Sequence, residues 1–162
     1  MKTLLSFLTF VFVVLITTDL ETIRTSYFSG PKTEESAIAF ADIMENIDSS
    51  SAILKAYQGA SFALQAKYGK GIKEKKEFFG QAVSNLEAAV KEESENAEIR
   101  LIRLSVQENS PGIVKYKTNM EEDKALVLEY FADQPEAIKR CIRDYATHSD
   151  FFSEAEKAQV LN

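Results

Sequence analysis

Two arginines in a strongly apolar segment carry the clearest binding chemistry of the sequence. Arg100, Arg103 and Gln107 recur at positions i, i+3 and i+7, so a helix would place them on one side. A guanidinium group donates paired hydrogen bonds that fit a carboxylate. One interpretation is a groove in which these side chains hold a carboxylate of a peptide or a small acid. The candidate ligand-binding residues are Arg100, Arg103, Gln107, Glu108, Asn109 and Tyr116.

The same arginines have an internal alternative. The segment 97–109 is apolar enough to lie at the centre of a fold, and a buried guanidinium group needs a carboxylate partner. Charge reversal at Arg100 and Arg103 distinguishes the two hypotheses. Loss of folding supports internal pairing, whereas loss of binding by a folded variant supports the groove. The candidate internal partners are Glu93, Glu95 and Glu122.

Covalent catalysis and metal binding find little support in the sequence. His148 is the only histidine, and on a helix it would lie about 10 Å beyond the only cysteine, Cys141. A nucleophile and its base must lie within hydrogen-bond reach, so these two do not form a catalytic pair. One histidine and one cysteine are too few for zinc, and the acidic runs lack the glycine-centred spacing of a calcium loop. We expect no catalytic residue, no metal and no cofactor.

The segments that position these side chains are predicted to be helices. Apolar residues recur at helical spacing in residues 33–47, 52–68, 73–91 and 97–108, and no run alternates apolar and polar residues. Capping boxes at Thr118, Asp133 and Ser153 predict three more helices. Residues 27–28 and 112–116 are expected to be loops. The predicted fold is all-α, with six to eight antiparallel helices in hairpins or in a compact bundle.

Two helix faces indicate how these helices pack. The segment 52–68 has a face of small residues, which permits the close approach of another helix. Cys141 lies at helical spacing with Ile138, Ile142 and Tyr145, which predicts a core position for its thiol. The small residues are Ala56, Gly59 or Ala60, Ala63 and Ala66.

The first eighteen residues predict export. Lys2 precedes an apolar stretch, and Asp19 and Glu21 follow it, which is the layout of a secretory signal peptide. A helix over residues 4–17 would be about 21 Å long, against roughly 30 Å of membrane hydrocarbon. Because residues 16–18 offer no small-residue cleavage site, an uncleaved anchor through residues 4–17 stays open. We expect a signal peptide or anchor over 1–18, a single helical domain over 19–162, and a periplasmic or extracellular location.

The charge balance restricts the partners. The chain has a net charge of −6 at pH 7, whereas nucleic acids and anionic lipids attract clustered lysines and arginines. We therefore expect no nucleic acid, and no membrane contact beyond the N-terminal segment. One cationic stretch is interpreted as a solvated loop or as a docking patch for an acidic partner. It contains Lys67, Lys70, Lys73, Lys75 and Lys76.

Residues 52–94 resemble a degenerate tetratricopeptide repeat. Gly59 and Phe62, preceded by Tyr57, match the small and aromatic positions of its first helix. The sequence departs from the repeat by an insertion of about eleven residues around 69–76. The resemblance implies stacked antiparallel helix pairs, as in α-solenoids, with a concave surface that binds a protein or peptide. The second-helix and closing positions are matched by Ala82, Leu86, Ala89 and Ser94, with serine in place of the usual proline.

A second resemblance concerns three short strings, at residues 57–60, 98–109 and 122–124. They look like small exported proteins of Bacteroidota that carry no assigned activity. The resemblance implies a periplasm or the outside of a Gram-negative cell, and it brings no catalytic residue.

The expected function is an exported helical scaffold or binding module for a protein or peptide partner. The sequence does not indicate whether the protein is a monomer or an oligomer. One alternative is a small envelope hydrolase or lyase that uses carboxylates, Tyr116 and the arginine pair. Another is a membrane-anchored structural protein of the envelope. A deep pocket is typical of an enzyme, and an open groove is typical of a binding module.

Overall fold

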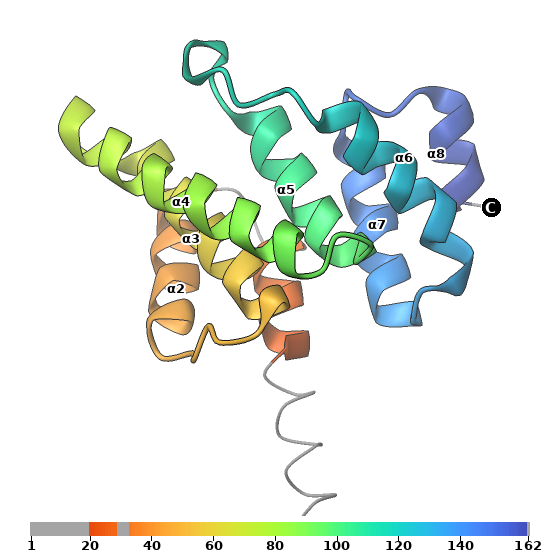
Figure 1. The fold of residues 1–162 in the computed structure, drawn as a ribbon, viewed down its shortest axis with the longest axis horizontal. Helices are drawn as coiled ribbons and strands as arrows, with labels where there is room; N and C mark the ends of the chain where they lie inside the picture. Colours follow the sequence, from red (N-terminus) through yellow and green to blue (C-terminus); the bar gives the residue numbers. More distant parts are fainter. Residues whose placement is uncertain (1–19, 29–32, 162) are drawn as a thin grey trace, which may run out of the picture.

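The computed structural model describes residues 20–28 and 33–161, and within these residues the chain forms helices and no strand (Figure 1). A first helical segment covers residues 20–28. The helices that follow are α2 (Glu34–Glu45), α3 (Ala52–Tyr68), α4 (Ile72–Glu92), α5 (Ala97–Asn109), α6 (Met120–Tyr130), α7 (Glu136–His148) and α8 (Glu154–Leu161). Two 3-10 turns, η1 (Gly112–Val114) and η2 (Phe131–Asp133), lie before α6 and before α7. The predicted all-α fold of six to eight helices is confirmed.

The signal peptide or anchor and the boundary of the domain at residue 19 lie outside the described residues, so they stay predictions. No helix among residues 20–28 and 33–161 is long and apolar enough to cross a membrane.

Helix α5 lies between two hydrophobic cores. Ile99 and Ile102 belong to the core that α5 shares with residues 20–28, α2, α3 and α4. Leu101 and Leu104 belong to the core that it shares with α6, α7 and α8. Figure 1 shows α5 between α4 on one side and α6 and α7 on the other. The central position predicted from the apolar composition of this segment is therefore correct.

Helices α3 and α4 form a long hairpin with a close contact at Gly59. A Cβ atom built on Gly59 would lie 2.9 Å from Leu86 Cγ and 3.0 Å from the carbonyl oxygen of Ala82. These separations are shorter than ordinary van der Waals contact, so only glycine fits without a shift of α4. Helix α2 packs against α3 as well. The prediction that small residues in 52–68 admit a close neighbour is confirmed at this position.

Replacing Gly59 with alanine should lower the free energy of unfolding by about 1 kcal/mol. The overpacked methyl group costs about 1–3 kcal/mol, and the better helix propensity of alanine returns about 1 kcal/mol. Gly80 is the matched control, because nothing lies within 4 Å of a Cβ atom built there. Gly80→Ala should therefore stabilise the protein by up to about 1 kcal/mol. Urea denaturation measures both variants, and equal stabilisation by the two would contradict the close contact.

Residues 27–28 are helical, which corrects the expectation of a loop. Ile23 is fully buried and Tyr27 is almost so, and the Tyr27 hydroxyl is hydrogen-bonded to Ser105 Oγ at 2.7 Å. The segment is too short for its apolar spacing to predict a helix, since isolated helices of this length are unstable in water. Packing of Ile23 and Tyr27 in the first core supplies the stability that the local sequence lacks.

Side chains cap helices α2, α5 and α8, and the cap at Ser153 is one of those predicted. Thr33 Oγ1 accepts a hydrogen bond from the backbone N–H of Ser36 at 3.2 Å, and Asn96 Oδ1 accepts one from that of Glu98 at 3.0 Å. Ser153 and Glu156 form a complete capping box at the start of α8. Each of these caps satisfies N–H groups that have no partner within their helix.

The capping boxes predicted at Thr118 and Asp133 do not form. Asn119 precedes α6 and Pro135 precedes α7, and neither makes a side-chain cap. Thr118 Oγ1 donates a hydrogen bond to the Asn119 side chain, and Asp133 lies in η2. Both helices nevertheless form, because their apolar faces pack into the second core.

The single cysteine is a core residue, as its spacing predicts. Cys141 is 6% exposed and packs in the second core with Ile138 and Ile142. Burial raises the pKa of the Cys141 thiol to about 12, so the thiol is protonated and unreactive at neutral pH. Alkylation by iodoacetamide, followed by mass spectrometry, should be at least about 100-fold slower in the folded protein than in urea. Similar rates in the two states would contradict the burial.

Candidate functional site

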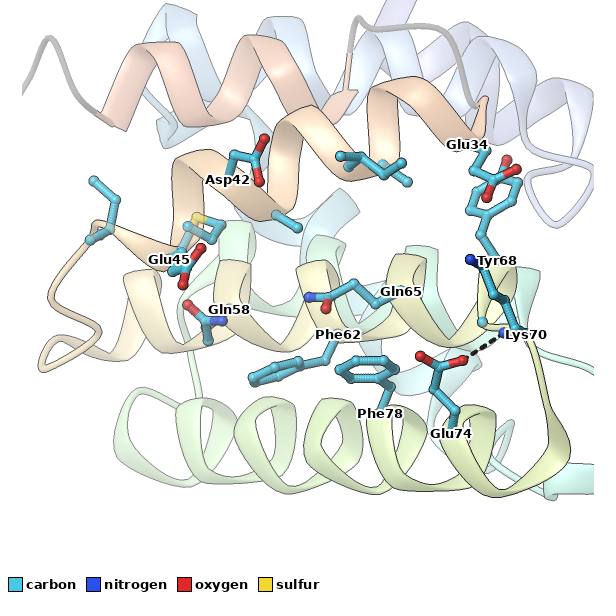
Figure 2. A pocket seen from close by; sticks show the side chains of 16 residues that line it. Glu34, Asp42, Glu45, Gln58, Phe62, Gln65, Tyr68, Lys70, Glu74 and Phe78 are labelled. Atoms are coloured by element: carbon cyan, nitrogen blue, oxygen red, sulfur yellow. Dashed lines mark hydrogen bonds between the residues drawn. The ribbon is translucent and has the colours of Figure 1, made fainter.

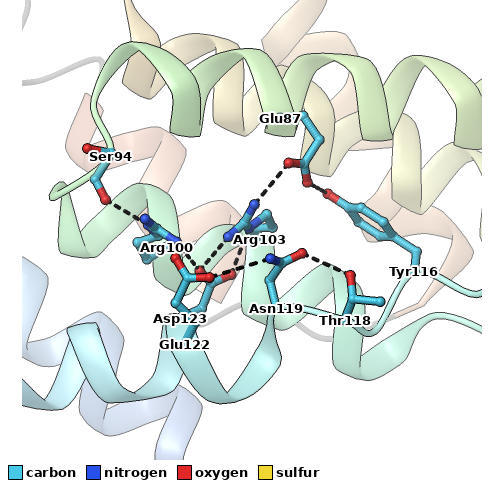
Figure 3. Close-up of polar contacts among 9 residues, drawn as sticks. All are labelled: Glu87, Ser94, Arg100, Arg103, Tyr116, Thr118, Asn119, Glu122 and Asp123. Carbon is cyan, nitrogen blue, oxygen red and sulfur yellow. Dashed lines mark hydrogen bonds and ion pairs between the residues drawn. The ribbon is translucent and has the colours of Figure 1, made fainter.

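The two arginines of α5 lie in a cluster that we call the arginine cluster: Arg100, Arg103, Glu87, Glu122 and Asp123 (Figure 3). Asp123 of α6 is fully buried and accepts hydrogen bonds from Arg103 Nε at 2.8 Å and Nη2 at 2.7 Å. Arg103 Nη1 donates to Glu87 of α4 at 3.0 Å. Burial acts to lower the pKa of Arg103, but the hydrogen bonds and charge of Asp123 outweigh it and raise that pKa.

Arg100 shares Asp123 with Arg103. Its Nη1 atom donates to Asp123 Oδ1 at 2.8 Å and to Glu122 Oε1 at 2.7 Å. Its Nε atom donates to the backbone carbonyl of Ser94 at 2.8 Å, in the connection between α4 and α5. The two guanidinium groups therefore join α5 to α6 through a carboxylate that water does not reach, and Arg103 joins α5 to α4 through Glu87.

These contacts test the internal partners that were expected for the arginines. Glu122 is confirmed as a partner. The prediction that Glu93 or Glu95 pairs with an arginine is wrong, because the turn after α4 presents the carbonyl of Ser94 to Arg100 instead. The partners that the sequence analysis missed are Glu87 and Asp123. Asp123 follows Glu122 directly in the first turn of α6, and the geometry of that turn decides which of the two is buried.

Of the other candidate residues, Tyr116 is the one that contacts the arginine cluster. Its hydroxyl donates to Glu87 Oε1 at 2.6 Å, and its ring packs edge-to-face on Phe79 of α4, with ring centroids 5.9 Å apart. Burial, together with the hydrogen bond to Glu87, raises the pKa of Tyr116. The Tyr116 hydroxyl is therefore a hydrogen-bond donor at neutral pH.

The remaining candidates, Glu108, Asn109 and Gln107, make no side-chain hydrogen bond or ion pair with the arginine cluster. Glu108 accepts hydrogen bonds from the hydroxyls of Tyr145 and Ser149, so it ties α5 to the end of α7. Asn109 is exposed, and its side chain donates to the carbonyl of a residue on its own helix. Gln107 is fully buried, and its amide makes no hydrogen bond with the described part of the chain.

A groove of about 690 Å³ runs between α2 and the α3–α4 hairpin (Figure 2). Phe62 of α3 and Phe78 of α4 stack on each other in its floor, with ring centroids 6.2 Å apart. Ile38 of α2 lines the groove and is 57% exposed, so apolar surface there is open to a partner. Further apolar lining comes from Ala37, Ala41, Met44 and Ile47. We call this cavity the α2–α4 groove.

The α2 side of the groove is acidic. Glu34, Asp42 and Glu45 line it, are exposed, and form no ion pair with any described residue. Lys70 lies at one end, where its backbone N–H donates to Glu74 Oε2 at 2.6 Å (Figure 2). The groove therefore combines an apolar floor with a negatively charged edge.

The sequence analysis did not identify the α2–α4 groove. A signal was nevertheless present, because Glu34, Ile38, Asp42 and Glu45 recur at i, i+4, i+8 and i+11 and so share one face of α2. The contribution of α3 and α4 to the floor could not be predicted, because it depends on how the hairpin packs beside α2.

The described residues hold no group of three or more His, Cys, Asp or Glu side chains arranged to bind a metal ion. A second, smaller hollow lies over the α4–α5 connection and is lined by residues 93–96. No protein-family model, curated protein or solved structure matches this chain. The similarity to tetratricopeptide repeats and to exported proteins of Bacteroidota therefore stays a prediction.

Proposed function

We propose that this protein is a binding module and that its α2–α4 groove receives a basic, amphipathic segment of a protein or peptide partner. The supporting observation is the pairing of an open apolar floor with three acidic side chains that have no ion-pair partner among the described residues. An amphipathic helix binds such a groove through apolar residues at i, i+3, i+4 and i+7. Lysines or arginines beside those residues would meet Glu34, Asp42 and Glu45.

The arginine cluster has a structural role in this proposal. Arg100 and Arg103 already donate to buried or nearby acceptors, so a ligand carboxylate would have to displace Asp123. Displacement would leave that carboxylate buried and unpaired, at a cost of several kcal/mol. The apolar floor of the α2–α4 groove, in contrast, is available without breaking any ion pair.

Export is part of the proposal, and it rests on the sequence of residues 1–18 alone. The mature protein then acts in the periplasm or outside the cell. N-terminal sequencing of the protein from its native cells tests this: a start near Asp19 supports cleavage, and a start at Met1 supports an anchor.

The groove is tested with a synthetic amphipathic peptide of leucine and lysine, labelled for fluorescence anisotropy, and with a matched peptide in which glutamate replaces lysine. We expect the lysine peptide to bind the purified protein and the glutamate peptide not to bind. The triple variant Glu34→Gln, Asp42→Asn, Glu45→Gln should weaken binding by about tenfold, since three exposed charge pairs at about 0.5 kcal/mol each add up to about 1.5 kcal/mol.

The matched control removes the same charges elsewhere, with Glu95→Gln, Glu129→Gln and Asp133→Asn. These three residues are exposed and lie outside the groove lining. The control should bind the lysine peptide as the parent does. If both triple variants lose affinity equally, the peptide responds to net charge alone and the assignment of the groove is wrong.

A further inference from the structure

The structure brings two cationic segments to one end of an acidic protein. The first is the α3–α4 connection, where residues 67–76 contain five lysines and one glutamate. The second is the loop around η1, where Lys115 and Lys117 stand in a stretch, residues 111–118, without an acidic residue. Figure 1 shows the start of α4 and the η1 loop at the same end, away from the first residues of segment 20–28. The ring contact of Tyr116 with Phe79 holds the η1 loop beside α4.

We call this end the basic tip, and its lysines differ from most other cations of the fold. The tip holds seven lysines, five in residues 67–76 together with Lys115 and Lys117, and none of them forms an ion pair with a described carboxylate. Ion pairs are formed, in contrast, by Lys55, Lys124 and the arginines at 24, 100, 103, 140 and 143. Some bind backbone carbonyls instead: Lys75 Nζ donates to Lys67 and Lys117 Nζ to Glu108. These contacts leave the positive charges uncompensated. Glu74 and Glu77 are the acidic residues nearby on α4.

Exposed isoleucines stand among these lysines. Ile72 begins α4 and is 77% exposed, and Ile113 of η1 is 89% exposed. They are the two most exposed large hydrophobic residues of the described chain. Each protrudes from a turn or a helix end that has lysines beside it. Lysine side chains around a protruding aliphatic residue are typical of surfaces that rest on a membrane, where the apolar group enters the acyl boundary and the ammonium groups meet lipid phosphates.

We propose that the basic tip binds the surface of an anionic lipid bilayer. The lysines supply attraction to the charged headgroups, and Ile72 and Ile113 insert below them. Nucleic acid fits the tip less well, because its binding surfaces use aromatic stacking or contacts to base edges, and aliphatic residues serve neither. The expectation of no membrane contact follows from the net charge of the whole chain, whereas this proposal rests on the local excess of lysine at the tip.

Vesicle co-sedimentation tests the proposal with two lipid compositions: phosphatidylcholine alone, and phosphatidylcholine with about one-third phosphatidylglycerol. The purified full chain should bind the anionic vesicles more strongly than the neutral ones, since the apolar residues 4–17 contribute equally to both, and added salt should reduce the difference. Lys73→Gln with Lys76→Gln should weaken it about 25-fold, because each lysine near such a surface strengthens binding about fivefold. Ile72→Ser with Ile113→Ser should weaken it about tenfold or more.

Two controls keep the test specific. Lys91→Gln with Lys139→Gln removes the same charge outside the tip, and Ile38→Ser removes an exposed isoleucine of the groove. Both should bind anionic vesicles as the parent does, and every variant carries the same residues 1–19. Equal binding to neutral and anionic vesicles, or equal losses in the tip and control variants, would overturn the proposal. Loss with the lysine variant but not the isoleucine variant would overturn the insertion of Ile72 and Ile113.

Discussion

Replacing Asp123 with asparagine should lower the free energy of unfolding by about 3–5 kcal/mol. The carboxylate of Asp123 is fully buried and accepts hydrogen bonds from both Arg100 and Arg103. Asparagine would turn an N–H₂ group toward donors and leave two poorly exposed guanidinium groups without their shared anion. Removal of one partner from a buried ion pair typically has a cost of this size. Chemical denaturation followed by circular dichroism measures the change.

Glu122→Gln is the matched control for Asp123→Asn. Glu122 accepts a hydrogen bond from Arg100 as well, but its side chain is 60% exposed. An exposed pair contributes about 1 kcal/mol or less, so the control should remain close to the parent in stability. A loss at Asp123 no larger than that at Glu122 would contradict the structural role of the arginine cluster. Loss of folding by Arg100→Glu, Arg103→Glu would agree with that role.

Replacing Arg24 with methionine should lower the free energy of unfolding by about 3 kcal/mol. Arg24 Nε and Nη2 donate to the two carboxylate oxygens of Glu98 at 2.7 and 2.8 Å, and the Glu98 side chain is 6% exposed. Without Arg24, the buried carboxylate would retain the hydrogen bond from the Tyr57 hydroxyl, at 2.7 Å, and its own charge would be uncompensated. Burial and the charge of Glu98 raise the pKa of Tyr57 well above its ordinary value, so that hydroxyl stays a donor.

The control for Arg24→Met is Arg140→Met. Arg140 also holds the first helical segment, through Glu21, but both side chains of that pair are exposed. Its removal should change the stability by about 1 kcal/mol or less. Hydrogen exchange of residues 20–28 provides a second measurement, because Arg24→Met should increase exchange there more than elsewhere. Equal effects of the two substitutions would contradict the account of Glu98.

The helices could be predicted from the sequence because their signals are local. The bounds predicted for 52–68 are those observed for α3, and the apolar composition around Arg100 predicts that α5 is central. The helical conformation of residues 27–28 was missed because the stability of segment 20–28 comes from contacts with residues far along the chain, such as Ser105. The capping pattern at Thr118 misled for a related reason: a three-residue spacing does not fix the backbone geometry that a cap needs.

The candidate site was harder to predict than the fold. The spacing of Arg100 and Arg103 correctly predicts a shared side of one helix, but the acceptor that joins them, Asp123, comes from α6. The stripe of Glu34, Ile38 and Asp42 is visible in the sequence, whereas the aromatic floor opposite it arises only when α3 and α4 pack. The net charge of the whole chain likewise does not reveal the local excess of lysine at the basic tip, because folding brings residues 67–76 and 111–118 to the same end.

The most direct test of the binding function is site-specific photo-crosslinking in cells that naturally produce the protein. A photoreactive residue at Ile38 places the probe in the α2–α4 groove, and one at Ala125, which is exposed on α6, is the control. We predict a discrete adduct at Ile38, absent at Ala125, whose crosslinked segment is rich in lysine or arginine and has apolar residues at helical spacing. The Glu34→Gln, Asp42→Asn, Glu45→Gln substitutions should abolish it. An adduct with an acidic segment, equal adducts at both positions, or none at either would contradict the proposal.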